Sequence, residues 1–597
     1  MRKLKVAFWC LCAALLAAFA NPPAAPQPEA AGTRLTATPD ELEVFPALSP
    51  SGDSLAYSSD RNGGHEIYIR RLDGQGSERQ VTSDGRHNLQ ADWSPDGKMI
   101  AFHSVRSGGI WVVPAQGAEG GKPRQLADFG SDPAWSPDGK MIAFQSAPLE
   151  ALSLYTFPAM PPSTLWLVPA AGGKPRQLTR PSEPQGGHGA PAWTRDGQRI
   201  AFTSNDIGSS GKLWTVSAKG DDLRLVDGVS LPRDPLFATD GGSLLFSAPD
   251  AGRGFRFGVW QVSAAGGKPA AVSALSARHL SLSRDGCKIA VSEMGLAGNL
   301  WTIPMSPETG KATGPAAPFT NDADDRNSQP VFSPDGKRLA LHRVVDGERF
   351  QIWLADPEGR SFSFLTREAT FGAGPPVWLP DGRHLVFLSR PESRPGAGKM
   401  LLKKIDVETK QVEPYVDLDP TWSWIRLSPE GKRVAFARTN ESTIGNIWML
   451  PALDGQPKQI TFDKESADFP MWSPDGKYLA VRLRRGEDTH IGVVSAEGGE
   501  VTQLTSGPGE NWLPSWSPDS SRIAFAGMRD GIWDIYWVAR TGGPVHKVTS
   551  QPDKLSTWVR YPVWYPKGDR IIFEYSRTLG DLWLLNTCPG EPQKKAR

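Results

Sequence analysis

The ten-residue stretch WSPDGKMIAF occurs twice in this chain, at Trp93–Phe102 and again at Trp135–Phe144. Its Ser-Pro-Asp-Gly core is turn chemistry, because Pro fixes φ at the first central position and Gly accepts the left-handed conformation that closes the turn. The residues before the turn and the Ile-Ala-Phe after it have the pattern of short paired strands. The stretch therefore predicts an antiparallel hairpin that the fold uses more than once.

Degenerate copies of this hairpin run through most of the sequence as P-x-W-S-P-D-G-K-x-I-A-F, followed by I-W-x-V and R-Q-L-T. With the Trp position as the marker, twelve copies lie 42 to 58 residues apart, with markers at Leu48, Trp93, Trp135, Trp193, Phe237, Leu282, Phe332, Trp378, Leu427, Trp472, Trp516 and Trp564. A period in the forties that is rich in β-branched and aromatic residues is typical of propeller blades. We therefore expect an all-β fold of twelve four-stranded antiparallel blades, each stacked on its neighbours.

The strands at the ends of the repeats favour two rings over one. The last repeat stops at Asp581–Asn586 without an R-Q-L-T strand, whereas Thr33–Thr36 (TRLT) is such a strand with no repeat before it. Ala317–Thr320 (APFT) is a weaker version in the middle of the chain. Two six-bladed propellers, over residues 33–316 and 317–588, result if these two strands close the sixth and twelfth blades. A single twelve-bladed ring would be far outside the usual range of blade numbers, and a seven-plus-five division stays open.

The repeat resembles the WD-related repeat of TolB-type propellers, which also occurs in the propeller domains of prolyl-oligopeptidase-like and tricorn-like proteases. The segment SSDRNGGHEIYIRRLDG (Ser58–Gly74) is similar to the remainder of the TolB-type unit. The resemblance covers nearly the whole chain after the first thirty residues. It is specific for the fold and implies little about function, because such propellers serve many purposes.

The first twenty residues have the layout of a secretory signal peptide. Three basic residues precede an apolar run and an Ala18-Phe19-Ala20 cleavage pattern, so we expect export to the periplasm or the exterior, with cleavage after Ala20. A Pro/Ala-rich linker over residues 21–32 and a disordered tail over 589–597 are expected around the repeats. The mature chain holds Cys287 and Cys588, which could form one bridge in an oxidising compartment. No other segment resembles a transmembrane span.

Charge and motifs exclude several function classes. The chain has 66 basic and 65 acidic residues with both signs interspersed, which does not favour a nucleic-acid partner. G-x-S-x-G, H-E-x-x-H and P-loop motifs are absent from the sequence, and there is no room after the last repeat for a hydrolase domain. We therefore expect no catalytic residues of those classes, no cofactor and no metal, and an enzyme is the less favoured interpretation.

Two groups of residues are candidates for binding. Three residues before each marker, the first propeller carries mostly polar residues and the second largely aromatic ones. Tryptophans outside the repeat positions also concentrate in the second propeller. The predicted partner site is an aromatic channel mouth made of Trp422, Trp424, Phe469, Trp512, Trp558 and Tyr561, and a weaker polar mouth is made of His87, Asp132, His188, Asp234 and His279. The alternative for the aromatic group is that its rings plug the channel or pack between the propellers.

The sequence therefore predicts an exported, non-catalytic scaffold. The TolB-type resemblance implies that it binds an envelope protein or peptide, or a saccharide, at a channel mouth. The competing hypotheses are a pore-centred polysaccharide lyase or hydrolase, for which the three histidines would matter, and a detached substrate-gating propeller of a peptidase system.

Overall fold

A computed structural model describes residues 32–38, 41–74, 77–149, 162–205, 211–249, 257–273, 275–322, 325–345, 349–367, 375–389, 401–417, 422–439, 444–452, 455–486, 488–552 and 554–588. The expected signal peptide, most of the linker and the expected tail lie outside these residues. No helix among the described residues is long and apolar enough to cross a membrane.

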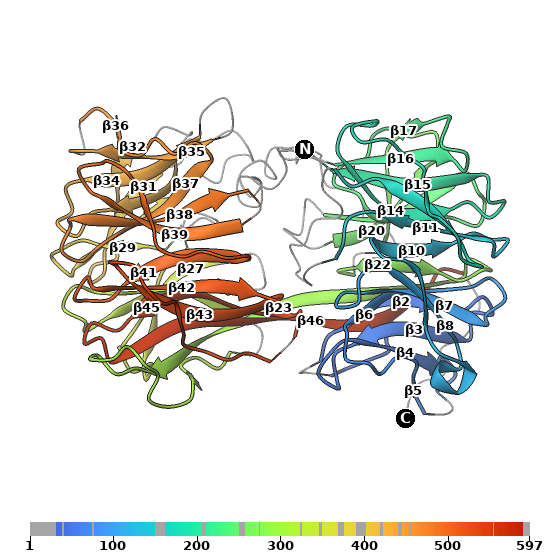
Figure 1. Cartoon of the computed structure of the whole chain (residues 1–597), viewed down its shortest axis with the longest axis horizontal. Helices are drawn as coiled ribbons and strands as arrows, with labels where there is room; N and C mark the ends of the chain where they lie inside the picture. Colours follow the sequence, from blue (N-terminus) through green and yellow to red (C-terminus); the bar gives the residue numbers. More distant parts are fainter. Residues whose placement is uncertain are drawn as a thin grey trace. The chain divides into compact units, whose positions relative to one another are not determined.

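The described strands form nine four-stranded antiparallel sheets and one ten-stranded sheet, and the chain divides into two compact units. The first unit contains the described residues of Ala18–Gly295, Asp553–Ser556 and Thr578–Arg597, and the second contains Leu296–Pro552 and Thr557–Arg577. Each unit is a β-propeller with six blades (Figure 1), which agrees with the expected fold.

The first five blades of the first unit follow one another along the chain. They are β2 (Glu43–Leu48), β3 (Ser54–Ser59), β4 (Glu66–Arg71) and β5 (Arg79–Gln80); β6 (Asn88–Trp93), β7 (Met99–Ser104), β8 (Ile110–Pro114) and β9 (Arg124–Ala127); β10 (Ser131–Trp135), β11 (Met141–Gln145), β12 (Leu165–Pro169) and β13 (Arg176–Gln177); β14 (Gly187–Trp193), β15 (Arg199–Asn205), β16 (Lys212–Ser217) and β17 (Arg224–Val226); β18 (Arg233–Phe237), β19 (Ser243–Pro249), β20 (Phe257–Ser263) and β21 (Ala270–Ser273). A short 3₁₀ helix, η2 (Gly117–Gly120), follows β8.

The second unit contains five blades of the same kind. They are β25 (Arg326–Phe332), β26 (Leu339–Val345), β27 (Arg349–Ala355) and β28 (Phe362–Thr366); β29 (Val377–Trp378), β30 (His384–Ser389), β31 (Leu401–Asp406) and β32 (Val412–Asp417); β33 (Trp422–Leu427), β34 (Val434–Thr439), β35 (Gly445–Leu450) and β36 (Lys458–Gln459); β37 (Ser466–Trp472), β38 (Tyr478–Arg485), β39 (Asp488–Ser495) and β40 (Thr502–Gln503); β41 (Glu510–Trp516), β42 (Arg522–Arg529), β43 (Ile532–Ala539) and β44 (His546–Lys547).

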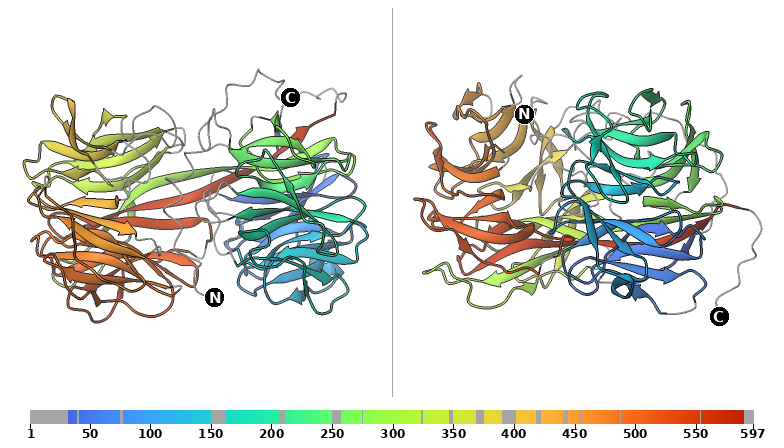
Figure 2. Two further views of the ribbon diagram at one scale, coloured as in Figure 1. Left: turned by 90° about the horizontal axis from the view of Figure 1, so that it is seen from above. Right: turned by 45° about the vertical axis from the view of Figure 1, so that its right-hand side comes forward.

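The sixth blade of each unit is built from two long strands that belong to both units. These strands are β23 (Lys288–Pro304) and β46 (Arg570–Asn586), which pair side by side (Figures 1 and 2). In the first unit, β22 (Arg278–Leu282) pairs with the first part of β23, and β1 (Gly32–Arg34) pairs with the last part of β46. In the second unit, β45 (Thr557–Trp564) pairs with the first part of β46, and β24 (Ala317–Pro318) pairs with the last part of β23.

The two units therefore exchange strands and are not consecutive segments divided between residues 316 and 317. The second unit begins at Leu296, within β23, and the chain returns to the first unit at Thr578, within β46. β1 and β24 are the two closing strands that the sequence indicated. The third strand of the sixth blade, however, is the last part of β46 in the first unit and the last part of β23 in the second. A disulfide between Cys287 and Cys588 joins the residues that flank this insertion.

The repeat motif acts as predicted within each hairpin. In the second blade, the Ser94 hydroxyl accepts a hydrogen bond from the Met99 amide (2.9 Å) and donates one to Asp96 Oδ1 (2.6 Å). Gly97 closes the turn with a φ of 72°. The side chains of Ser and Asp thus satisfy the turn's main-chain groups, which is why this tetrapeptide recurs.

Several marker tryptophans form hydrogen bonds between neighbouring blades. The indole Nε1 of Trp93 donates to the main-chain oxygen of Ala47 in the preceding blade at 3.0 Å. Trp193, Trp378, Trp472 and Trp516 make the equivalent bond across their own blade boundaries, at 2.8 to 3.2 Å. The apolar core lies between the blades, as in the cluster that joins the first two. Each marker therefore both fills this core and fixes the spacing of the inner strands.

Candidate functional site

Eleven of the twelve inner strands contain a β-bulge three residues before their marker, and β29 is the exception. The pairing register shifts there, between Val44 and Ala47 in the first blade for example. Eleven of the twelve positions have a φ between 48° and 60°: Phe45, Gln90, Asp132, Ala190, Asp234, His279, Gln329, Trp424, Phe469, Leu513 and Tyr561. The twelfth is Pro375, whose ring forbids a positive φ. Since left-handed backbone costs about 1–2 kcal/mol for each residue with a Cβ, the fold maintains a strained ring at this level, here called the bulge ring.

Contacts between neighbouring blades show that these positions surround a common axis in each unit. In the first unit, the rings of Phe45 and His279 lie 3.9 Å apart and join the first blade to the sixth. The Asp132 amide donates to Gln90 Oε1 at 3.0 Å. In the second unit, Trp424 stacks on Phe469 at 3.8 Å. The bulge ring therefore lines the central channel of each propeller.

The bulge ring of the first unit is polar and reached by solvent. Asp132 and Asp234 are both half-buried. Burial raises the pKa of Asp132 to about 7, and the negative charges of Asp234 and Asp92 add to this effect. Burial also acts on Asp234, but His279 and Arg278 outweigh it and hold the pKa of Asp234 below its ordinary value. The channel thus holds two carboxyl groups with pKa values displaced in opposite directions.

Arg278, with the His279 amide, accounts for the ionised state of Asp234. The His279 amide donates to Asp234 Oδ2 at 3.0 Å, and Arg278 Nε lies 3.6 Å from the same oxygen. The His279 imidazole itself is neutral at pH 7, because burial lowers its pKa to about 3. Asp234 therefore stays ionised, whereas Asp132 is a carboxyl group that titrates near neutrality.

The three candidate histidines do not form one group. His188 is fully buried and held by Thr179 Oγ1 (2.8 Å) and by the main-chain oxygen of Pro184 (2.7 Å). His87 lies against His65 instead, with the two Nδ1 atoms 3.3 Å apart. His279 alone belongs to the bulge ring. Within the described ranges, no three His, Cys, Asp or Glu side chains are arranged to hold a metal ion.

The aromatic residues of the second unit are mostly interior. Phe469, Trp512, Trp558 and Tyr561 are 2 to 7% exposed and belong to one apolar cluster. Arg482 covers Phe469 with its guanidinium 4.3 Å from the ring centroid. This burial corrects the picture of an exposed aromatic mouth, because the four rings pack inside one apolar cluster of the unit. A binding role for the set stays a prediction.

Trp422 and Trp424 are the half-buried members of the set. Trp422 stacks on Phe436 at 3.9 Å, within its own blade. Trp424 lies in the bulge ring beside Phe469. A partner at this mouth would meet these two rings first.

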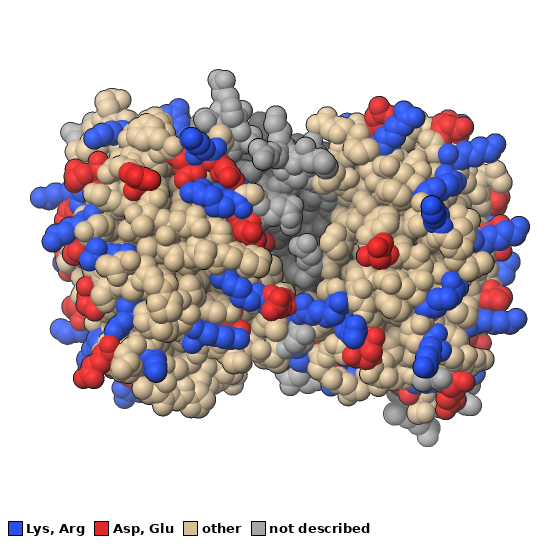
Figure 3. Space-filling model, in the orientation of Figure 1, with Lys and Arg blue, Asp and Glu red and all other residues tan. Residues whose placement is uncertain are grey.

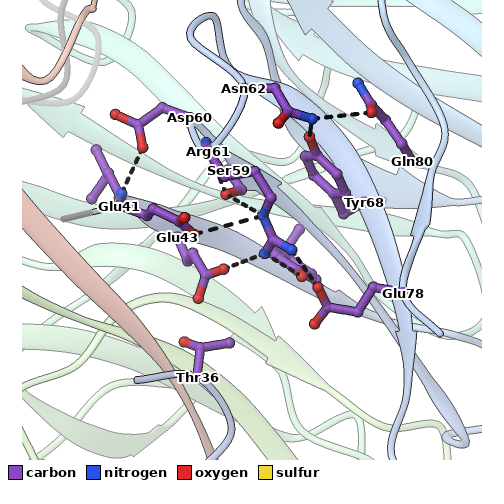
Figure 4. Close-up of polar contacts among 12 residues, drawn as sticks. Thr36, Glu41, Glu43, Ser59, Asp60, Arg61, Asn62, Tyr68, Glu78 and Gln80 are labelled. Atoms are coloured by element: carbon purple, nitrogen blue, oxygen red, sulfur yellow. Dashed lines mark hydrogen bonds and ion pairs between the residues drawn. The ribbon is translucent and has the colours of Figure 1, made fainter. Parts of the chain in front are cut away.

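A cluster around Arg61, which the sequence did not single out, is the most connected polar group of the first blade (Figure 4). The Arg61 guanidinium pairs with Glu43 and Glu78 and also donates to the Tyr57 hydroxyl at 2.8 Å. It lies 4.5 Å from the centroid of Tyr68. Glu43 is completely buried, and this burial raises its pKa. Arg61 thus compensates the charge of a carboxylate inside the propeller.

Asp60, the neighbour of Arg61, fastens the segment that leads into the first blade. Its Oδ1 accepts the amide of Leu42 at 2.8 Å, and its Oδ2 accepts the Ser556 hydroxyl at 3.1 Å. Lys554 Nζ lies 3.4 Å from Oδ2. These residues all belong to the first unit. Asp60 therefore fixes both the N-terminal segment of this unit and the Asp553–Ser556 segment to the first blade.

Charge on the outer surface is mixed. In Figure 3, acidic and basic side chains are interspersed over the visible face of each unit. The distinctive electrostatics therefore lie in the channels, where the sequence pattern three residues before each marker had pointed.

Comparison with known proteins extends the repeat resemblance. A family model described as the TolB β-propeller domain matches residues 29–161 and 415–581. The uncharacterized peptidase YuxL of Bacillus subtilis is 29% identical over 168 residues, 28% of this chain and 23% of that protein. Tricorn protease homolog 1 of Streptomyces coelicolor is 24% identical over 477 residues, 74% of this chain and 41% of that protein.

The chain therefore spans less than half the length of these two curated relatives. Among solved structures, a putative TolB from Agrobacterium tumefaciens aligns with a TM-score of 0.36 and 19% identity, over 48% of this chain and 99% of that one.

Proposed function

The chain belongs to the TolB β-propeller domain family, and from this premise we propose that it is an exported, non-catalytic scaffold that binds an extended segment of an envelope protein or peptide in the channel of its first unit. Export is supported by the basic-then-apolar N-terminus with its Ala18-Phe19-Ala20 pattern. It is also supported by the Cys287–Cys588 disulfide, since such bonds persist mainly in oxidising compartments.

The observation that carries the proposal is the half-buried carboxyl pair of the first bulge ring. Asp132 and Asp234 reach solvent inside a channel whose walls lower the local dielectric, so a positive charge there interacts more strongly than on the surface. A lysine, an arginine or an α-amino group of an extended segment is the complementary partner. The second channel is filled by its own rings, which makes it the less accessible of the two.

Peptides of opposite charge test this proposal directly. Fluorescence anisotropy would compare a short extended peptide with one terminal lysine against the same peptide with glutamate, on wild type, Asp132→Asn and Asp128→Asn. Asp128 is an exposed aspartate of the second blade and gives the same change in net charge. We expect the lysine peptide alone to bind, about tenfold more weakly to Asp132→Asn and unchanged to Asp128→Asn.

The pH dependence adds a second criterion. Because the pKa of Asp132 is about 7, the charge that attracts the peptide develops between about pH 6 and pH 8, so affinity should rise over this range in wild type and not in Asp132→Asn. Equal binding of both peptides, or equal binding by both variants, would refute the assignment. An aminated oligosaccharide as third probe identifies a saccharide partner if it alone binds.

Catalysis is the second candidate, and one observation favours it. Two carboxyl groups with pKa values displaced in opposite directions are the arrangement that general acid–base hydrolysis uses. Turnover of an oligosaccharide panel, lost in both Asp132→Asn and Asp234→Asn while the fold is retained, would establish this function and displace the scaffold. A peptidase-gating role would show as altered cleavage when a partner peptidase is added.

A further inference from the structure

A second set of residues stands one position before each marker of the second unit, and its member Arg426 interacts with Met471 of the next blade and with Tyr561 of the bulge ring. This set is here called the adjacent ring and consists of Val331, Val377, Arg426, Met471, Ser515 and Val563. Arg426 Nε lies 3.0 Å from the sulfur of Met471, its counterpart in the next blade. The ring lies nearer to the Ser-Pro-Asp-Gly turns than the bulge ring does, because the marker and the turn follow it directly.

The two levels of this channel differ in their access to solvent. In the bulge ring, Phe469, Leu513 and Tyr561 are 2 to 7% exposed and close the passage. In the adjacent ring, the residues half-buried rather than buried are Val331, Val377, Met471 and Val563. The bulge ring is therefore the more closed level of this channel, and the adjacent ring, toward the short turns, is the more accessible one.

Arg426 is the charged residue of this level, and no carboxylate of the described part of the chain pairs with it. It is 6% exposed. Among the described residues its guanidinium contacts the Ile425 main-chain oxygen, 2.8 Å from Nη1, and the Met471 sulfur. Burial lowers the pKa of Arg426 to about 10, which still leaves it positive at pH 7.

Two other buried arginines of the second unit are paired with carboxylates. Arg482 pairs with Asp468, with both of its bonds at 2.6 to 2.7 Å, and Arg326 pairs with Glu574 at 2.8 and 3.1 Å. In the adjacent ring of the first unit, Asp92 accepts the Trp135 amide at 2.7 Å. A buried cation without such a partner is costly, so Arg426 stands out among the arginines of its channel.

We propose that Arg426 binds a small oxyanion, a carboxylate or a phosphate, that enters the second channel from the face of the Ser-Pro-Asp-Gly turns. The planar guanidinium offers paired N–H donors that match two oxygens of such a group. Valine and methionine walls exclude water around it and strengthen the attraction. The site has the opposite charge to the carboxyl pair of the first channel and stands independently of the function proposed above.

Calorimetric titration tests this site with two probes. Sodium acetate and sodium phosphate would be titrated at constant ionic strength, adjusted with sodium chloride, into wild type, Arg426→Met, Arg426→Lys and Arg438→Met. Arg438 is the matched control, a half-buried arginine that lies over Trp448 and pairs with no described carboxylate. We expect saturable binding of at least one probe by wild type and Arg438→Met, and at least about tenfold weaker binding by Arg426→Met.

Arg426→Lys keeps the charge and loses the paired donors, so its affinity should fall between those of wild type and Arg426→Met. The probe that binds more tightly identifies the class of oxyanion. Unchanged affinity in Arg426→Met, or no saturable binding of either probe by the wild type, would overturn the assignment.

Discussion

Replacing Arg61 with methionine should destabilise the first blade strongly and in a pH-dependent way. The variant leaves Glu43 completely buried without its cation. Glu43 can then avoid an uncompensated charge only by binding a proton. Binding a proton at pH 7 to a carboxyl group whose ordinary pKa is 4.5 costs about 1.4 kcal/mol for each pH unit between the two, or roughly 3 kcal/mol.

The other contacts of Arg61 add less. The Tyr68 ring, 4.5 Å from the guanidinium, contributes about 1 kcal/mol. Glu78 is partly exposed and contributes little. The expected loss is therefore about 3–4 kcal/mol at pH 7 and about 1–2 kcal/mol at pH 5, where protonation of Glu43 is nearly free. The sign follows from the raised pKa, because stability of the variant is lost as the pH rises above 4.5.

Hydrogen exchange of the β2 and β3 amides, followed by mass spectrometry, measures this loss locally and does not require the whole chain to unfold in one step. Arg71→Met is the matched control, since Arg71 pairs with Asp73 on the surface and its removal should leave the exchange of these amides nearly unchanged. Adding Glu43→Gln to Arg61→Met should recover part of the loss at pH 7. A loss below about 1 kcal/mol, or one equal at pH 5 and pH 7, would refute the reasoning.

Three further outcomes are expected. Trp93→Phe should cost about 1 kcal/mol more than Trp135→Phe in denaturant unfolding, because the Trp93 indole donates to Ala47 whereas the Trp135 Nε1 has no partner among the described residues. Equal costs would contradict the role of this hydrogen bond between blades. Cys588→Ser should lower the thermal midpoint to that of the reduced wild type, since the bridge closes a loop with a sequence separation of 301 and is worth up to about 5 kcal/mol by loop-closure entropy. A midpoint insensitive to reductant would argue against it. Asp132→Asn should remove a stability loss, on the order of 2 kcal/mol, that wild type shows between pH 5 and pH 8, because a carboxyl group with a folded pKa of about 7 binds more protons in the native state. Parallel pH profiles for the two proteins would rule this out.

The fold was predictable because its information is local and repeated. A Ser-Pro-Asp-Gly turn, a marker tryptophan and a fixed spacing specify a hairpin and its neighbour in every copy. The strand exchange was not predictable, because Asn299–Pro304 and Asp581–Asn586 have the same third-strand pattern and either fits the sixth blade of either ring.

The candidate sites were predictable in position and less so in state. The residues three before each marker do line the channels, but the positive φ that turns them inward depends on the bulge, which no composition signal encodes. Whether rings such as Phe469 and Tyr561 are exposed depends on how many blades surround them and how large their counterparts are. The carboxylates that Arg61 meets, and the absence of one at Arg426, depend on contacts between segments far apart in sequence.

The exchange of β23 and β46 imposes an order on biogenesis. The second propeller is assembled from the stretch Leu296 to Arg577, apart from Asp553–Ser556, which belong to the first propeller. It can close as soon as that stretch has been synthesised. The first propeller is translated earlier but waits for Thr578–Asn586 to supply its missing strand. Its ring therefore remains open during synthesis, and the part made first is the part finished last.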